Sequence, residues 1–364
     1  MDSLRSLLKT LIQFESVAER TDQLIAIINY AEKYLEHPNL RIDRFLRNEK
    51  PSLVASFKKS NRDRHFKVIF AGHLDVVPAD MEQFIAREED GKIYGRGALD
   101  MKGPCAVMMK LFKDLAEEGS EYDIALMLTT DEEIGSQNGV RYLLEEEGYS
   151  SDFAVIPDSG ENFHIITDEK GALHFAVEFS GKPAHGSMPW LGESAIEKAI
   201  AFYGEARASL LYDSDDPEHW HNTLTLGRFV GGNKVNQVPP NARIELDFRF
   251  VPPYTLEEAK SVVRYLAKKY GAKVEFLSDG EPFSTDLEHP ISKAFIESVR
   301  EVLGEVRFGK THGATDGRFF AKKGIPVMMI YPEGGDIHGS NEWVSIPSLE
   351  KLYRIFRTFV ERVG

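Results

Sequence analysis

The sequence has little cysteine, no excess of basic residues and no long apolar run. Cys105 is the single cysteine among 364 residues, so no disulfide can form within one chain, and a cytoplasmic, reducing location is expected. Acidic residues outnumber basic ones by 58 to 44, which argues against a nucleic-acid partner because phosphate contacts need clustered Lys and Arg. No stretch approaches about 18 consecutive apolar residues, so neither a membrane span nor a membrane partner is expected. The charged, leucine-rich N-terminus is typical of an amphipathic helix rather than a signal peptide.

The order of helical and strand patterns changes in the middle of the sequence. Helix and strand patterns alternate at both ends of the chain, which is typical of an α/β domain. Between them, residues 171–278 follow the order strand, helix, strand, strand, helix, strand, which predicts a ferredoxin-like α+β fold. We therefore expect a discontinuous α/β domain of residues 1–168 and 279–364, into which a smaller domain of residues 169–278 is inserted.

Short apolar runs in the α/β portion are each followed by an acid or a histidine. Their length and their flanking Gly, Pro and Asp residues are typical of parallel strands buried on both faces. The carboxyl ends of such strands lie at one edge of an open α/β sheet, where ligands bind. The runs are residues 66–71, 124–128, 153–157 and 325–331. The candidate ligands near this edge are His73, Asp100, Glu133, Asp158 and His338. Each alone also fits a polar residue in a strand-ending turn, but together they predict a two-metal hydrolytic site.

Two further acids have positions that suit supporting roles. Asp75 stands two residues after His73 and suits a carboxylate that orients the imidazole, the alternative being a solvent-exposed acid at a strand end. Glu132 and Glu133 are adjacent, so their side chains cannot easily point the same way. One can hold a metal while the other faces water. The alternative is a charged helix start that complements the helix dipole.

Six motifs, in chain order, resemble those of a known enzyme family. They are GHLDVVPA from Gly72, GRGALDMKG from Gly95, TTDEEIGS from Thr129, IPDSGE from Ile156, GKPAHGSMPWLGESAI from Gly181 and IHGSNEW from Ile337. The sequence resembles the dizinc peptidases that include aminoacylase, glutamate carboxypeptidase, acetylornithine deacetylase and succinyl-diaminopimelate desuccinylase. This resemblance implies a zinc-peptidase domain with a central mixed, largely parallel sheet, and an inserted ferredoxin-like domain that serves as a lid and for dimerisation.

The resemblance also assigns the metal ligands. Asp100, in a glycine-rich loop, would bridge two Zn²⁺ ions in each subunit. His73 and Asp158 would complete the site of one ion, and Glu133 and His338 the site of the other. Co²⁺ and Mn²⁺ are alternative metals, because occupancy follows availability as well as ligand type.

Catalytic and substrate-binding roles follow from the same resemblance. Glu132 would be the general base, and His185 would stabilise the oxyanion, reaching the site from the partner subunit of a homodimer. The positions that match substrate-binding residues of the family are Asn236, Arg249, Gly313 and Thr315. For Arg249, an ion pair with Asp247 that stabilises the fold is the alternative.

The expected function is hydrolysis of an amide bond in a small substrate, either a short peptide or an N-acyl amino acid. Asp158 stands where desuccinylases, aminoacylases and glutamate carboxypeptidases usually have Glu and where di- and tripeptidases have Asp. We therefore expect a di-/tripeptidase or carboxypeptidase, with an N-acyl-amino-acid deacylase as the alternative. A non-catalytic metal-binding protein of this fold is a minor alternative, and the presence of Glu132 and of every ligand argues against it.

Overall fold

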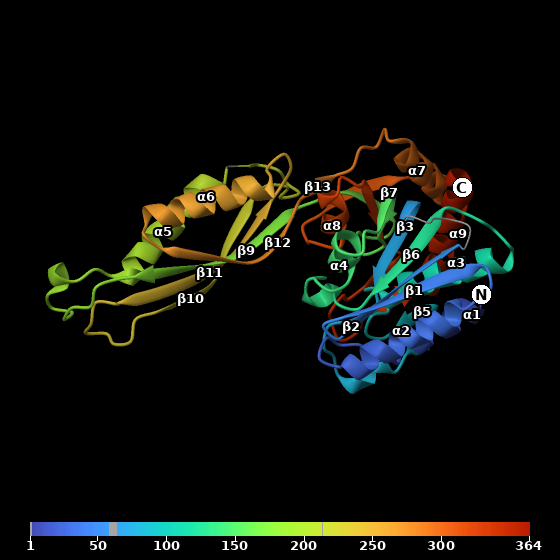
Figure 1. Cartoon of the computed structure of the whole chain (residues 1–364), viewed down its shortest axis with the longest axis horizontal. Helices are drawn as coiled ribbons and strands as arrows, with labels where there is room; N and C mark the ends of the chain where they lie inside the picture. The colour runs from blue at the N-terminus through green and yellow to red at the C-terminus, as the bar shows by residue number, and fades with distance from the viewer. Residues whose placement is uncertain (1, 58–63, 213) are drawn as a thin grey trace. The chain divides into compact units, whose positions relative to one another are not determined.

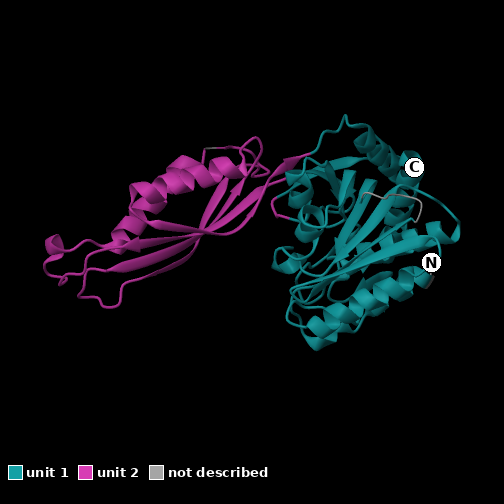
Figure 2. Ribbon diagram, in the orientation of Figure 1, with its two compact units in different colours: residues 1–168, 285–311, 315–364 teal, residues 169–284, 312–314 magenta. Residues whose placement is uncertain are grey.

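The computed structural model describes residues 2–57, 64–212 and 214–364, which form two compact units (Figures 1 and 2). Unit 1 comprises residues 1–168, 285–311 and 315–364, and unit 2 comprises residues 169–284 and 312–314. Unit 2 therefore runs beyond the residue 278 at which the sequence pattern placed the end of the insertion. The reason is that its last long strand continues to Gly280 and is followed by a further short strand.

Helices occur in both units, and among the described residues α5 and α6 are the helices of unit 2. The α-helices are α1 (Asp2–Ile12), α2 (Thr21–Leu35), α3 (Lys102–Glu117), α4 (Val140–Glu145), α5 (Ala195–Leu210), α6 (Leu256–Lys269), α7 (Pro290–Leu303), α8 (Gly317–Lys322) and α9 (Ile346–Val363). None of the helices that the structure describes has the length and apolar composition of a membrane-crossing segment.

The strands of unit 1 are β1 (Leu40–Arg47), β2 (Lys50–Phe57), β3 (His65–His73), β4 (Arg87–Glu89), β5 (Lys92–Tyr94), β6 (Ile124–Thr129), β7 (Ser150–Val155), β8 (His164–Glu169), β14 (Arg307–Thr311), β15 (Val327–Ile330), β16 (Gly334–Gly335) and β17 (Trp343–Ser345). Those of unit 2 are β9 (Gly171–Ser180), β10 (Thr223–Gly231), β11 (Asn241–Phe250), β12 (Lys273–Gly280) and β13 (Phe283–Ser284).

Unit 1 is built on a large mixed sheet. Its described strands include the series β1-β2-β6-β3-β7-β15-β8, with β14 paired to β8. β3 runs parallel to β6 and to β7, and β15 runs parallel to β7. The pairs β1/β2, β2/β6 and β15/β8 are antiparallel. The predicted mixed central sheet, parallel at its middle strands, is confirmed.

The middle strands are apolar on both faces because both faces are buried. Phe70 of β3 packs edge-on against Phe112 of α3 and Phe356 of α9, at ring-centroid distances of 6.1 and 5.3 Å. Ile69, which points to the other face, is also fully buried. Each such side chain contributes roughly 1.5–3 kcal/mol to folding. This two-sided burial explains why the runs are continuously apolar instead of alternating.

Unit 2 has the predicted ferredoxin-like topology. Its antiparallel strands follow the order β10-β11-β9-β12. α5 and α6 share a hydrophobic core with alternate strand residues such as Phe175 and Phe248. The intervening positions of these strands carry polar side chains that form ion pairs. Arg243 Nη1 lies 2.7 Å from Glu178 Oε1, and Arg243 Nη2 lies 3.0 Å from Glu275 Oε2. The alternation of apolar and charged residues along β9 and β11 is the pattern of a sheet with one covered face.

Candidate metal centre

The carboxyl ends of the parallel strands in unit 1 bring the candidate ligands together. β3 ends at His73, Glu133 lies in the turn after β6, Asp158 follows β7, and His338 lies in the loop after β15. Asp100 precedes α3. These side chains form two groups that share Asp100, one with His73 and Asp158 and the other with Glu133 and His338. Within each group the ligand atoms all lie within 4.8 Å of one another.

Asp100 has the geometry of a bridging carboxylate. Its Oδ1 lies 3.2 Å from His73 Nε2, and its Oδ2 lies 3.2 Å from His338 Nε2. His73 Nε2 is also 3.6 Å from Asp158 Oδ1, and His338 Nε2 is 3.3 Å from Glu133 Oε1. Each oxygen of Asp100 thus faces a different histidine and a different second acid. One carboxylate that serves two adjacent sites is what a two-metal centre requires.

The imidazole of His73 is held in the tautomer that a metal ligand needs. Its Nδ1 lies 2.9 Å from the backbone carbonyl oxygen of Asp75, which can only accept a hydrogen bond, so Nδ1 carries the proton. Nε2 faces the oxygens of Asp100 and Asp158, which can only accept, so either a proton on Nε2 or an ion bound to its lone pair must lie between them. Acceptors that face one another in a buried site need a cation or a proton between them. This donor set therefore fits a metal ion.

Glu133 offers a buried oxygen that also fits a cation. Within the described chain, its Oε1 accepts no hydrogen bond, although His338 Nε2 is close by. An unsatisfied buried acceptor costs about 1–3 kcal/mol unless another group or ion meets it. The backbone N–H of Glu133 donates to Asp75 Oδ2 at 3.0 Å, which ties this turn to the end of β3.

The Asp75 carboxylate was expected to orient the imidazole of His73, and this role remains a prediction. In the structure the carboxylate Oδ1 is 3.6 Å from Nδ1, and the backbone carbonyl of the same residue is the acceptor. Asp75 is fully buried rather than exposed, and its carboxylate supports the turn that carries Glu133.

The site is strongly acidic. Burial raises the pKa of Asp158 to about 7, with a further contribution from the charge of Asp100 that the hydrogen bond with His73 opposes. Burial disfavours the charged form of His73, but the neighbouring carboxylates of Asp100, Asp158 and Asp75 outweigh it and raise the pKa of His73 well above its usual value. Burial, followed by the charge of Asp158, also raises the pKa of Glu132. A bound cation would favour the charged forms of these buried acids and lower their pKa values.

Glycines let the loop that carries Asp100 approach its neighbours closely. Gly97 has a φ of 80°, and a Cβ there would lie 2.8 Å from Val76 and 2.9 Å from Lys102. At Gly103 a Cβ would lie 2.3 Å from the carbonyl oxygen of Ala98. A larger residue at Gly103 would need a backbone shift, and one at Gly97 would have a strained φ and would displace the side chains of Val76 and Lys102. The loop therefore packs closely against its neighbours at these two glycines.

A model of the Peptidase family M20/M25/M40 matches the chain over residues 69–362, which include every candidate ligand. The chain belongs to this family. The resemblance drawn from the motifs is thereby confirmed. As a member of this family, the chain is a metal-dependent hydrolase that acts on amide or peptide bonds.

Named relatives of this M20/M25/M40 chain include two desuccinylases. A succinyl-diaminopimelate desuccinylase of Bordetella petrii is 30% identical over 351 residues, covering 90% of this chain and 90% of that protein. Another, of Coxiella burnetii, is 28% identical over 314 residues, covering 80% of this chain and 83% of that protein.

Similar solved structures include peptidases. An M20 family metallo-carboxypeptidase of Sulfolobus solfataricus has a TM-score of 0.79 and 19% identity, covering 100% of this chain and 99% of that chain. The aminopeptidase PepT of Bacillus cereus has a TM-score of 0.76 and 20% identity, covering 100% of this chain and 98% of that chain. At these identities the structures establish the fold alone.

Tyr331 is a residue of the centre that the sequence reasoning missed. Its hydroxyl group lies 3.1 Å from Asp100 Oδ1 and 3.1 Å from Asp158 Oδ1. It stands at the end of an apolar run and was read only as part of a buried strand. The sequence signal that could have identified Tyr331 is its hydroxyl group, which stands at the carboxyl end of the apolar run 325–331.

Two of the proposed functional residues lie side by side in unit 2. His185 and Asn236 are exposed, and the backbone N–H of Gly186 donates to the carbonyl oxygen of Asn236 at 2.8 Å. The backbone N–H of Ser187 donates to His185 Nδ1 at 3.2 Å, so Nδ1 is an acceptor and the neutral ring carries its proton on Nε2. Nε2–H is therefore the donor that His185 can offer to a ligand.

The remaining predicted substrate-binding residues are spread over both units. Arg249 makes the ion pair that was the alternative interpretation, because its Nε lies 2.8 Å from Asp247 Oδ1. Thr315 is buried in unit 1, where its hydroxyl accepts from the backbone N–H of Gly317 at 3.1 Å. Gly313 belongs to unit 2. Substrate binding by these residues remains a prediction.

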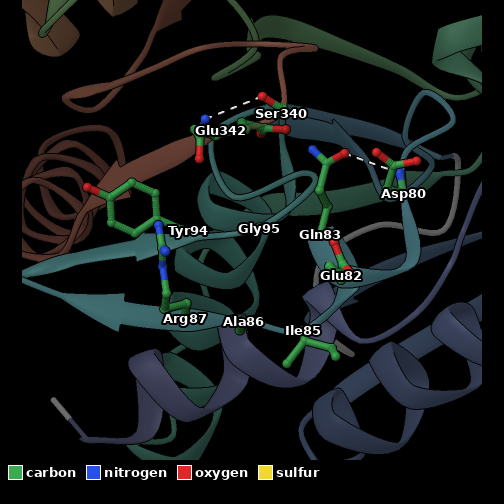
Figure 3. A pocket seen from close by; sticks show the side chains of 11 residues that line it. Asp80, Glu82, Gln83, Ile85, Ala86, Arg87, Tyr94, Gly95, Ser340 and Glu342 are labelled. Atoms are coloured by element: carbon green, nitrogen blue, oxygen red, sulfur yellow. Dashed lines mark hydrogen bonds between the residues drawn. The ribbon is translucent and has the colours of Figure 1, made fainter.

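A surface cavity of unit 1 borders the loop that carries His338 (Figure 3). Its lining includes Gln83, Gly95 and Glu342, and it includes none of the candidate metal ligands. Figure 3 shows the side chain of Gln83 bonded to the backbone N–H of Asp80, at 3.2 Å. This cavity therefore lies next to the loop that carries His338, and the candidate metal ligands do not line it.

Proposed function

We propose that this chain is a two-zinc peptidase that hydrolyses short peptides, as a di-/tripeptidase or a carboxypeptidase. The observation that carries the proposal is the pair of ligand groups around Asp100, whose two oxygens face His73 and His338. Imidazole and carboxylate donors suit Zn²⁺, and they would also accept Co²⁺ or Mn²⁺.

The proposed mechanism assigns one task to each group of residues. His73 and Asp158 would hold one ion, Glu133 and His338 the other, and Asp100 both; when bound, the ions supply Lewis acidity and lower the pKa of water. Glu132 lies outside both ligand groups. It is proposed to take a proton from the attacking water and to deliver it to the leaving nitrogen.

The charge of the site favours a substrate with a free amino group. Besides the ligands, the acids Glu132, Asp75 and Asp316 act on the centre electrostatically. Two dications and the nearby Lys102 and Arg318 offset much of this negative charge. Any of these carboxylates left without a cation would attract the ammonium group of a peptide and repel the carboxylate of an N-succinyl group. Asp158, shorter than the Glu usual in deacylases, supports the same choice.

Deacylation of an N-acyl amino acid is the second candidate function. The observation that favours it is the 30% identity with a succinyl-diaminopimelate desuccinylase over 90% of both proteins. The two candidates share the metal centre and Glu132, and they differ only in the group attached to the substrate nitrogen.

A matched substrate panel separates the two candidates. Dipeptides and tripeptides with a free amino terminus are expected to show kcat/KM values at least about tenfold above those of the same peptides after N-acetylation, which corresponds to about 1.4 kcal/mol. The same ratio is expected against N-acetyl and N-succinyl amino acids. If N-succinyl-diaminopimelate is instead the best substrate, the peptidase proposal is wrong and the second candidate holds.

We also propose that the protein is a homodimer in which His185 of the partner subunit donates a hydrogen bond to the oxyanion. The family resemblance supports this assignment, and so does the Nε2–H donor that the ring of His185 offers. A donor aimed at the developing negative charge stabilises the transition state more than the ground state.

Subunit mixing tests this proposal. Glu132→Ala and His185→Ala proteins, each nearly inactive alone, are dissociated and reassembled in equal amounts. About half of the dimers should be mixed, each with one intact site, so about a quarter of the wild-type activity should return. Each variant taken through the same cycle alone serves as the control. Verified subunit exchange without recovered activity would refute action from the partner.

A further inference from the structure

A buried ion pair joins the two loops that carry Asp100 and His338. Arg96 Nη1 lies 2.8 Å from Glu342 Oε2, and the side chains are 3% and 0% exposed. The sequence reasoning assigned no role to either residue. A buried ion pair is stable only when its remaining donors and acceptors are also satisfied. Within the described residues Arg96 Nε has no hydrogen-bond partner, whereas both Nη atoms of Arg96 and both oxygens of Glu342 have partners, and these identify what the pair holds in place.

The Glu342 carboxylate organises the loop that carries Asp100. Its Oε2 accepts from Arg96 Nη1 and from the backbone N–H of Gly97, both at 2.8 Å. Its Oε1 accepts from the backbone N–H groups of Leu99 at 2.9 Å and of Asp100 at 3.0 Å. The loop thus wraps around this carboxylate, as backbone N–H groups do around a bound anion. The position of the Asp100 backbone is fixed directly by Glu342.

Arg96 extends the same support to the loop of His338. Its Nη2 donates to the carbonyl oxygens of His338 at 3.0 Å and of Gly339 at 3.1 Å. Gln83 Nε2 also donates to the Gly339 carbonyl, at 2.9 Å, and Figure 3 shows Gln83 and Glu342 lining one cavity. His338 has a φ of 61°, a left-handed conformation that non-glycine residues rarely adopt. The bonds from Arg96 hold the backbone in that conformation.

We infer that Arg96 and Glu342 are positioning residues that set the placement of Asp100 relative to His338, and with it the ion site that these two ligands share with Glu133. The inference rests on the proposed metal centre. Both side chains act through the backbone of the two loops, and neither belongs to a ligand group. A guanidinium suits this task because its planar array of N–H groups reaches a carboxylate and two carbonyls at once.

The substitution Glu342→Gln tests the role of the carboxylate with little change of volume. An amide presents an NH₂ group in place of one acceptor oxygen, so at least one pair of the converging N–H donors loses its acceptor. The backbone at Asp100 should then shift. A partner that orients a metal ligand typically changes metal affinity by about 10- to 100-fold when it is replaced.

The measurement is a titration of the full-length protein with Zn²⁺ against a competing chelator. Glu342→Gln is expected to lower the Zn²⁺ affinity of the site formed by Asp100, Glu133 and His338 by about 10- to 100-fold. The visible absorption spectrum of the Co²⁺-loaded protein should change with it. Val344→Ala is the matched control, because it removes buried methyl groups of β17 two residues away but keeps Arg96 and Glu342. It should lower stability and leave the zinc affinity and the cobalt spectrum unchanged.

Arg96→Lys decides the matter if Glu342→Gln does not fold. A lysine keeps a positive charge opposite Glu342, but one ammonium group cannot also span both carbonyls of the His338 loop. We expect weaker zinc binding and an altered cobalt spectrum here too. A folded variant of either kind that binds both ions within about twofold of wild-type affinity, with the wild-type spectrum, overturns the inference. Absence of metal binding by the wild-type protein would instead overturn the proposed function.

Discussion

Replacement of Glu132 by glutamine is expected to lower kcat by about 10²- to 10⁴-fold, the contribution typical of a general base. The amide cannot accept the proton of the attacking water, and the change of volume is small. Because Glu132 belongs to neither ligand group, both metal ions should stay bound. The test compares kcat for a dipeptide substrate with the metal content of the same preparation.

Glu161→Gln provides the matched control for this variant. Glu161 is an exposed glutamate in the segment that follows Asp158, and no role in the reaction is assigned to it. Its replacement should leave kcat near the wild-type value. Turnover by Glu132→Gln that is as fast as that of the control would remove Glu132 from the role of base.

Removal of the metal is expected to abolish hydrolysis entirely. Without ions, the acceptors of His73, Asp100 and Asp158 face one another with only protons to separate them, and no group is left to polarise the carbonyl. Dialysis against a chelator should therefore eliminate activity, and added Zn²⁺ or Co²⁺ should restore it. The thermal midpoint should fall as well, since ions at about 100 times their Kd stabilise a folded site by about 2.7 kcal/mol.

Magnesium is the control for the recovery. Mg²⁺ prefers six oxygen ligands, whereas His73 and His338 offer nitrogen, so Mg²⁺ should not restore hydrolysis. Full activity after exhaustive chelation, with no transition metal left in the protein, would contradict the metal-dependent mechanism.

The sequence predicted the parts of the site that follow from local pattern. His73 and Asp158 follow apolar runs that form parallel strands, and the rule that parallel strands end at a common edge placed them together. The ferredoxin-like order of β9–β12 with α5 and α6 was readable for the same reason, because each element has its own periodicity.

The support of the site could not be predicted in the same way. Glu342 bonds to Leu99 and Asp100, which are more than two hundred residues away in the sequence. Such a contact leaves no trace in local periodicity. The bond from His73 to the Asp75 carbonyl was missed because every residue has a carbonyl group, so residue type gives no signal. Tyr331 was missed because an aromatic residue at the end of a strand most often packs in the core.

The most direct test of the central claim is the location of metal in crystals of the active protein by anomalous scattering at the zinc edge. The account predicts two peaks in each chain. One should lie between His73, Asp100 and Asp158, and the other between Asp100, Glu133 and His338. Crystals of fully active protein without a peak at either position, or with metal bound only elsewhere, would contradict the account.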